Sequence, residues 1–174
     1  MNSQNASLIS ESYLNQQKKL HENPNYGVAS ISFAPFVTQL INKLGILELT
    51  DYGCGKGRLA ENITPDHPIN IQMYDPAREG YNDTPRPTQM VCCIDVLEHI
   101  EPDLIDNVFD DLRRVTKEVG FFTIHTGPAI KILDDGRNAH LIQEDMDWWL
   151  PKIMDRFKLN TVQRTDNGFW VLVE

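Results

Sequence analysis

A glycine-rich segment that begins with an acidic residue is the first place where this sequence suggests chemistry. Asp51-Tyr52-Gly53-Cys54-Gly55-Lys56-Gly57 follows a predicted strand and precedes a predicted helix. Glycines at such a position let the backbone turn tightly and approach a ligand closely. The next predicted strand ends at Asp75, whose carboxylate can accept hydrogen bonds from both hydroxyls of a ribose. Together, the two features predict a site for an adenosine-containing cofactor at the carboxyl ends of the strands.

The spacing of the glycines distinguishes between two classes of such cofactor. A dinucleotide fingerprint requires Gly-x-Gly-x-x-Gly, but here Gly57 comes one place early and Arg58 occupies the third position. An acid followed by Gly-x-Gly-x-Gly suits S-adenosylmethionine, which has no pyrophosphate to bind. The alternative is a purely structural glycine turn, and the placement of Asp75 at the next strand end argues against it.

A second group of reactive side chains follows the predicted strand Met90–Ile94. Asp95, Glu98 and His99 are spaced i, i+3 and i+4, so a helical turn projects all three to one side. If the cofactor is S-adenosylmethionine, the chemistry to consider is transfer of the methyl group from its sulfonium. That transfer needs an aligned acceptor and, for some acceptors, removal of a proton. His99 is a candidate base near neutral pH. The alternative is that Glu98 caps the following helix and that His99 packs or forms a structural hydrogen bond.

Strands that alternate with helices must position these groups. The pattern predicts an α/β fold with a doubly wound, mostly parallel sheet, and Thr165-Asp166-Asn167-Gly168 predicts an antiparallel C-terminal hairpin. We expect residues 1–25 to form a tail with a short helix, and residues 26–174 to form a single domain. The predicted helices are Ser10–His21, Phe33–Leu44, Arg58–Asn62, Pro102–Lys117 and Glu144–Phe157; the predicted strands are Ile46–Tyr52, Asn70–Tyr74, Met90–Ile94, Phe121–His125, Lys158–Arg164 and Phe169–Val173.

Composition limits the partners that such a domain can have. The chain has 174 residues, of which 41% are hydrophobic, enough for the core of one domain. Its net charge of -9 argues against a basic surface that binds nucleic acid through counterion release. Its three cysteines, Cys54, Cys92 and Cys93, lack the spacing of a zinc site, and reduced thiols are the simplest interpretation. Without a signal or membrane-spanning pattern, we expect a cytoplasmic protein with no membrane partner.

At this point the chain resembles the class I S-adenosylmethionine-dependent methyltransferases, over about residues 26–174. The segment Asp51 to Gly57 matches the first motif of that family, and Asp75 matches its ribose-binding acid. Ile94-Asp95-Val96-Leu97-Glu98-His99-Ile100 resembles a strand-end motif of the ubiquinone-biosynthesis-type branch. Asp134 to Ile142, followed by Trp148-Trp149, is similar to small methyltransferase-like proteins of bacteria and phages.

The resemblance implies a Rossmann-like fold, S-adenosylmethionine as cofactor, and methyl transfer to oxygen or nitrogen of a small polar acceptor. It also shows a departure, because only residues 76–89 fill the space where the family usually has a third strand and its helix. We therefore expect a sheet that is shortened there, and Asp83 is a candidate adenine contact. The expected cofactor-binding residues are Asp51, Gly53, Cys54, Gly55, Gly57, Asp75, Pro76 and Asp95, and the expected catalytic residues are His99, His140 and Glu98.

Two other functions remain open from the sequence. One is a non-catalytic or regulatory module that binds S-adenosylmethionine. The other is a metal-assisted RNA 2′-O-methyltransferase, because Asp95, Glu98 and His99 with the distant His140 resemble the metal site of such enzymes, although the negative net charge suits RNA poorly. His125 is a lesser candidate, on the side of the sheet where the ligand is expected. Tyr26 and Arg137 are candidates to contact the methionine carboxylate or the acceptor, and one of Trp148 and Trp149 is a candidate to border the acceptor.

Overall fold

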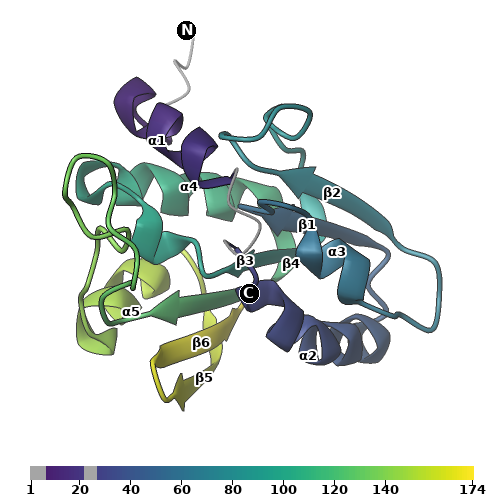
Figure 1. Cartoon of the computed structure of the whole chain (residues 1–174). Helices are drawn as coiled ribbons and strands as arrows, with labels where there is room; N and C mark the ends of the chain where they lie inside the picture. Colours follow the sequence, from purple (N-terminus) through teal and green to yellow (C-terminus); the bar gives the residue numbers. More distant parts are fainter. Residues whose placement is uncertain (1–6, 22–26) are drawn as a thin grey trace, which may run out of the picture.

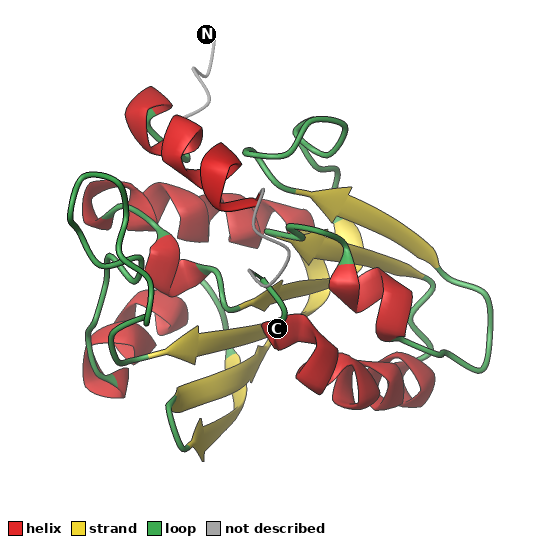
Figure 2. Cartoon of the chain, viewed as in Figure 1, coloured by secondary structure: helices red, strands yellow, loops and turns green. Residues whose placement is uncertain are grey.

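A single six-stranded sheet organises the computed structural model, which describes residues 7–21 and 27–174 (Figures 1 and 2). The strands lie in the order β2-β1-β3-β4-β6-β5, the first four parallel and the last two joined as an antiparallel hairpin beside β4. The doubly wound α/β fold and its terminal hairpin are thus confirmed. The strands are β1 Glu48–Tyr52, β2 Asn70–Tyr74, β3 Thr88–Ile94, β4 Thr116–His125, β5 Leu159–Thr165 and β6 Gly168–Val173; the helices are α1 Glu11–His21, α2 Ala29–Leu44, α3 Arg58–Asn62, α4 Ile105–Val115 and α5 Met146–Met154, with short 3-10 turns at Leu97–His99 and Pro102–Leu104.

Each face of the sheet is covered by one pair of helices. α4 and α5 cover one face, where α4 buries Ile105, Val108, Phe109, Leu112 and Val115 along a single stripe. This stripe has the helical period that the sequence displays, which is why the helix was predictable. α2 and α3 cover the other face, around Val37, Ile41 and Leu59. Among the described residues, no helix is long and apolar enough to cross a membrane.

The sheet is shortened beyond β2, as the sequence predicts. Residues 75–87 contain neither a helix nor a strand, and β2 is therefore the edge strand next to β1. Two aromatic rings cover the sheet beside this gap: Tyr52 and Tyr74 pack with their ring centroids 4.9 Å apart. The Tyr52 hydroxyl donates to Asp111 of α4 at 2.8 Å, and Arg114 of α4 donates to the carbonyl of Pro85 in the connecting loop. The side chains of α4 thus anchor the short connection.

Several helix boundaries differ from the predicted ones. α2 begins at Ala29 rather than Phe33, with Pro35 inside the helix. α4 ends at Val115, because Thr116 already pairs with Thr88 of β3 and extends β4. α5 begins after Asp145, whose carboxylate caps it by accepting from the backbone N–H groups of residues 147 and 148.

α1 and the residue before it dock against two connections that lie far away in sequence, the one from β3 to α4 and the one from β4 to α5. The Tyr13 hydroxyl donates to the carbonyl of His99 at 2.7 Å, and Ser10 donates to the Glu101 carboxylate through both its N–H and its hydroxyl. An apolar cluster joins Tyr13 to Leu133 and Ala139 of the loop. The boundary that we expect between residues 25 and 26 stays a prediction.

Candidate functional site

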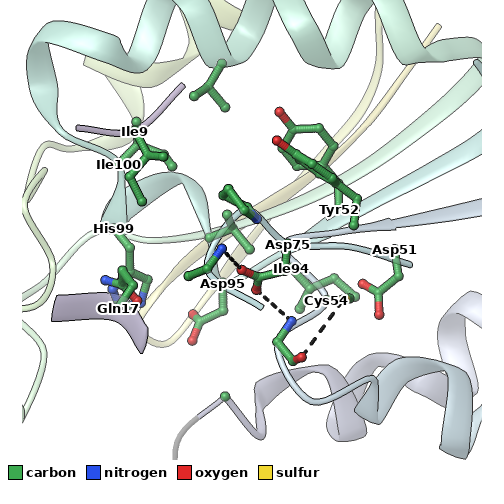
Figure 3. A pocket seen from close by; sticks show the side chains of 18 of the residues that line it. Ile9, Gln17, Asp51, Tyr52, Cys54, Asp75, Ile94, Asp95, His99 and Ile100 are labelled. Atoms are coloured by element: carbon green, nitrogen blue, oxygen red, sulfur yellow. Dashed lines mark hydrogen bonds between the residues drawn. The ribbon is translucent and has the colours of Figure 1, made fainter. Parts of the chain in front are cut away.

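A pocket opens at the carboxyl ends of β1, β2 and β3, where the sequence predicts the cofactor. The glycine loop forms its floor, α1 contributes to the opposite wall, and the start of α2 borders it (Figure 3). The residues that line it are Leu8, Ile9, Tyr13, Gln17, Gly27, Ala29, Ser30, Asp51, Tyr52, Gly53, Cys54, Gly55, Lys56, Tyr74, Asp75, Pro76, Ala77, Ile94, Asp95, Val96, His99, Ile100 and Val108.

The glycine loop needs glycine for two physical reasons. Gly53, Gly55 and Gly57 all have positive φ angles, of 76°, 50° and 73°. At Gly53 there is also no room, since a Cβ would lie 2.5 Å from a methyl carbon of Val96. Gly53 and Gly55 line the pocket, whereas Gly57 lies outside the lining and initiates α3.

Asp75 joins the end of β2 to this loop. Its Oδ2 accepts a hydrogen bond from the Gly55 N–H at 2.9 Å, and its Oδ1 accepts one from the Ala77 N–H at 2.8 Å. The two bonds hold the carboxylate between the glycine loop and the turn that follows β2. The side chain is buried and lines the pocket, as expected for a group that meets a ribose.

Asp51 is the second acid of the pocket floor and is electrostatically unusual. Its side chain is buried, and its Oδ2 has no hydrogen-bond partner in the parts of the chain that the structure describes. Burial, reinforced by the neighbouring charge of Asp75, raises the pKa of Asp51 from 3.8 to about 7. A buried acid without a donor, facing a pocket, is a site for a cationic group.

Of the two acids Asp95 and Glu98, only Asp95 reaches the pocket. Asp95 lines the pocket and has a φ of 58°, the only non-glycine residue with positive φ in the described ranges. Glu98, in contrast, is completely buried and does not line the pocket. Its Oε1 accepts from the His125 backbone N–H at 2.8 Å, and it does not serve as the expected helix cap. The chain makes only a short 3-10 turn here, so the helical spacing expected from the sequence does not hold.

Three histidine rings contact one another at the edge of the pocket. The His140 ring contacts both the His99 ring, at a centroid distance of 4.7 Å, and the His125 ring, at 4.8 Å. His99 borders the pocket, whereas the buried His140 does not, and its Nδ1 lies 2.7 Å from the carbonyl of Gly127. The Nδ1 of His99 lies 2.8 Å from the carbonyl of Ala139, which fixes that nitrogen as the protonated one in the neutral ring. Burial and the adjacent His140 lower the pKa of His99 to about 4, so it is neutral at physiological pH.

The lesser candidates lie elsewhere. Asp83 is exposed and outside the pocket, Arg137 is exposed and pairs with Asp135, and Tyr26 is outside the described residues. Neither tryptophan borders the pocket: Trp149 is fully buried in the core, and Trp148 packs beside it. Within the described residues, no group of histidine, cysteine, aspartate and glutamate side chains is arranged to hold a metal ion. The four residues proposed above as metal ligands therefore do not form a metal site.

Sequence reasoning missed the wall that α1 contributes. Tyr13 and Gln17 lie on its inner face, and both are buried. Their spacing of four residues places both side chains on one face of the helix. A glutamine on that face was the available signal, since buried polar side chains need a partner or a ligand. The early start of α2, with Ala29 and Ser30 at the pocket, carried no such signal.

Comparison with known proteins defines the class. A family model described as a methyltransferase domain matches residues 15–166, and the chain belongs to that family. No curated protein sequence matches it. Among solved structures, it is similar to 1,6-didemethyltoxoflavin-N1-methyltransferase of Burkholderia thailandensis, solved with 1,6-didemethyltoxoflavin and S-adenosylhomocysteine, with a TM-score of 0.66 and 12% identity over 99% of this chain and 91% of that one.

Two further structures share the fold. The mitomycin 7-O-methyltransferase MmcR has a TM-score of 0.65 and 13% identity, over 94% of this chain and 59% of that one. Magnesium protoporphyrin IX methyltransferase of Synechocystis PCC 6803, solved with S-adenosylhomocysteine, has a TM-score of 0.57 and 12% identity, over 94% of this chain and 93% of that one. At these identities the likeness concerns the fold, while the family match identifies a methyltransferase.

Proposed function

We propose that the pocket binds S-adenosylmethionine and that the chain transfers its methyl group to oxygen or nitrogen of a small acceptor. The observation that carries this proposal is Asp51, a buried acid that lacks a hydrogen-bond donor among the described residues and faces the pocket beside the glycine loop. S-adenosylmethionine carries two cationic centres, a sulfonium and an ammonium. Either of them can supply the positive charge that would balance an ionised Asp51.

The other residues of the floor fit the rest of the cofactor. Asp75 presents a buried carboxylate to the ribose hydroxyls, and Gly53 and Gly55 line the pocket with backbone alone. Cys54 and Pro76 line the same pocket and offer small apolar surfaces. Gly57 does not line the pocket, and its role is to turn the chain into α3.

The acceptor belongs on the side of α1, where Tyr13, Gln17 and His99 meet the pocket. The apolar side chains of Ile9 and Ile100 line this region, which favours an acceptor with an apolar body and one polar group. His140 contacts His99 rather than the pocket, so its role in this proposal is to position the His99 ring. Known structures with this fold include an N1-methyltransferase and a 7-O-methyltransferase, so the fold leaves oxygen and nitrogen acceptors equally open.

One observation favours a second candidate, a binding module without turnover. With its pKa lowered to about 4, the His99 imidazole is a weak proton acceptor at neutral pH. An acceptor that needs a strong base is then methylated poorly, unless another group removes its proton. The two candidates share the cofactor site and differ only in methyl transfer.

Calorimetry with S-adenosylhomocysteine tests the cofactor site. We expect the wild-type chain to bind it and Asp75→Ala to weaken binding by about tenfold to a hundredfold, because a charge-assisted hydrogen-bond pair contributes about 1.5–3 kcal/mol. Asp83→Ala is the matched control, since Asp83 is exposed and does not line the pocket. A folded wild-type chain that does not bind S-adenosylhomocysteine at millimolar concentration would refute the proposal. Radiolabelled methyl that reaches no component of a cell extract would favour the binding module.

A further inference from the structure

Two adjacent carboxyl groups, those of Asp95 and Glu98, lie beside the pocket. Glu98 is completely buried, and its Oε1 accepts a hydrogen bond from the His125 N–H. Its Oε2 is also buried and meets no hydrogen-bond donor in residues 7–21 and 27–174, while the Asp95 carboxyl lies within hydrogen-bonding reach. Two carboxyl groups in contact satisfy each other only when one of them keeps its proton.

The environment decides which of the two keeps the proton. Burial, together with the nearby Asp95, raises the pKa of Glu98 well above its usual value. Asp95 borders the pocket and is less deeply buried, so it is better placed to carry the negative charge. A neutral Glu98 that donates to Asp95 satisfies the buried Oε2 and removes the repulsion between the two groups.

The backbone holds Asp95 in place. Its φ of 58° lies in the left-handed region that side chains other than those of asparagine and aspartate seldom adopt. Its N–H donates to the Thr123 hydroxyl on β4 at 3.0 Å. Backbone strain of this kind persists where the surrounding structure over-determines it, and it concentrates at functional sites.

We propose that Asp95 binds the hydroxyl or N–H group of an uncharged acceptor and takes its proton, and that Glu98 is the neutral residue that positions Asp95. This inference rests on the proposed function. It assigns proton removal to a carboxylate at the pocket wall, while His99 stays a neutral hydrogen-bonding group beside it. Asp51, Asp75 and Asp95 all line the pocket, so an acceptor with an anionic reacting end is repelled.

The step balances in atoms and charge. The acceptor heteroatom forms a bond to the methyl carbon as the sulfur–methyl bond breaks, and the electron pair of that bond stays on sulfur. Asp95 receives the proton that the heteroatom loses and becomes neutral. Glu98 keeps its own proton throughout, and the Asp95 proton passes to solvent when the pocket opens.

Replacement of Glu98 by its neutral isostere tests the positioning role. In Glu98→Gln the amide oxygen can accept from His125 N–H and the amide nitrogen can donate to Asp95, so both contacts survive. We expect this variant to retain wild-type thermal stability, whereas Glu98→Ala loses both contacts and is less stable. Carboxyl carbon NMR of the unliganded chain at pH 7, assigned by the signal missing in Glu98→Gln, should show Glu98 protonated. An ionised Glu98, or a Glu98→Gln variant as damaged as Glu98→Ala, would overturn the pairing.

Three single-ring fragments that differ in one group test the acceptor class: phenol, aniline and benzoate. In ligand-observed NMR at pH 8 with saturating S-adenosylhomocysteine, we expect phenol and aniline to bind the wild-type chain and benzoate not to bind. Asp95→Asn should weaken the binding of phenol and aniline at least fivefold and raise the binding of benzoate, each measured with S-adenosylhomocysteine at a concentration that saturates the variant. Asparagine tolerates a left-handed φ, so this variant is expected to fold.

The outcomes separate this inference from the proposed function. Loss of S-adenosylhomocysteine binding in the wild-type chain refutes the proposed function, while the protonation state of Glu98 is still measured in the unliganded protein. Binding of S-adenosylhomocysteine with no binding of phenol or aniline overturns the acceptor class alone. Equal binding of all three fragments, or an Asp95→Asn variant that binds them as the wild type does, also overturns it.

Discussion

Asp51→Asn should stabilise the unliganded protein at alkaline pH and weaken its binding of S-adenosylhomocysteine. Asp51 is buried, and its Oδ2 meets no donor among the described residues, so its charge is unfavourable until a cation arrives. Burial and the charge of Asp75 raise its pKa from 3.8 to about 7 in the folded protein. Asparagine has nearly the same shape and carries no charge.

The sign and the size of the effect follow from linkage between protonation and folding. Because the folded-state pKa is raised, the contribution of Asp51 to stability is fully present below pH 3.8 and is lost as the pH rises through about 7. The two pKa values differ by about three units, and each unit corresponds to about 1.4 kcal/mol. The wild-type chain therefore loses at most about 4 kcal/mol at pH 8 from this group, and Asp51→Asn does not.

Urea unfolding of both proteins without cofactor, at pH 4 and pH 8, measures this difference. We expect the free energies of unfolding to be similar at pH 4, and the variant to be the more stable protein at pH 8 by a few kcal/mol. The subtraction isolates Asp51, because His99, Glu98 and the other titrating groups are common to both proteins. Asp83→Asn, at an exposed site, is the control and should show no pH-dependent difference.

Ionisation of Asp51 should destabilise the unliganded protein but strengthen its binding of the cofactor. The affinity of the wild-type chain for S-adenosylhomocysteine should increase as the pH rises through about 7, because ionised Asp51 then meets the ligand's ammonium. Asp51→Asn should bind at least tenfold more weakly at pH 8 and lose this pH dependence. A stability difference that stays constant from pH 4 to pH 8, or an equal affinity of both proteins, would refute the reasoning.

The remaining predictions concern the loop, the short connection and metals. Gly53→Ala should destabilise the protein by about 2–4 kcal/mol and abolish measurable cofactor binding, because the new Cβ would lie 2.5 Å from a Val96 methyl. Gly136→Ala is the control, since Gly136 has a positive φ but open space around it, and it should lower the free energy of unfolding in urea by only about 1 kcal/mol. Equal losses in the two variants would contradict the steric argument. Tyr52→Phe should lower the free energy of unfolding by about 1 kcal/mol through loss of the hydrogen bond to Asp111, and an unchanged value would show that water replaces it. Treatment with EDTA should leave S-adenosylhomocysteine affinity unchanged, as calorimetry can establish, since the described residues form no metal-binding group.

The parts of the fold and site that the sequence predicted are those set by local rules. Gly53 and Gly55 have positive φ angles because the chain turns directly from a strand into a helix. The glycine spacing between a predicted strand and a predicted helix is enough to predict this turn. Asp75 follows β2 directly, and parallel strands bring their carboxyl ends to one edge, so its place beside the loop followed from topology. The stripe of α4 and the terminal hairpin likewise follow from periodicity and turn chemistry.

Tertiary structure alone decided the opposite wall of the pocket. Tyr13 reaches the carbonyl of His99, and His99 reaches the carbonyl of Ala139, across separations of 86 and 40 residues that no local pattern encodes. Glu98 was predicted to face the pocket from its helical spacing, but the chain forms a 3-10 turn that buries it against β4. The protonation states of Asp51, Glu98 and His99 were equally inaccessible from the sequence, because each depends on how much water and which charges the completed fold leaves around the group.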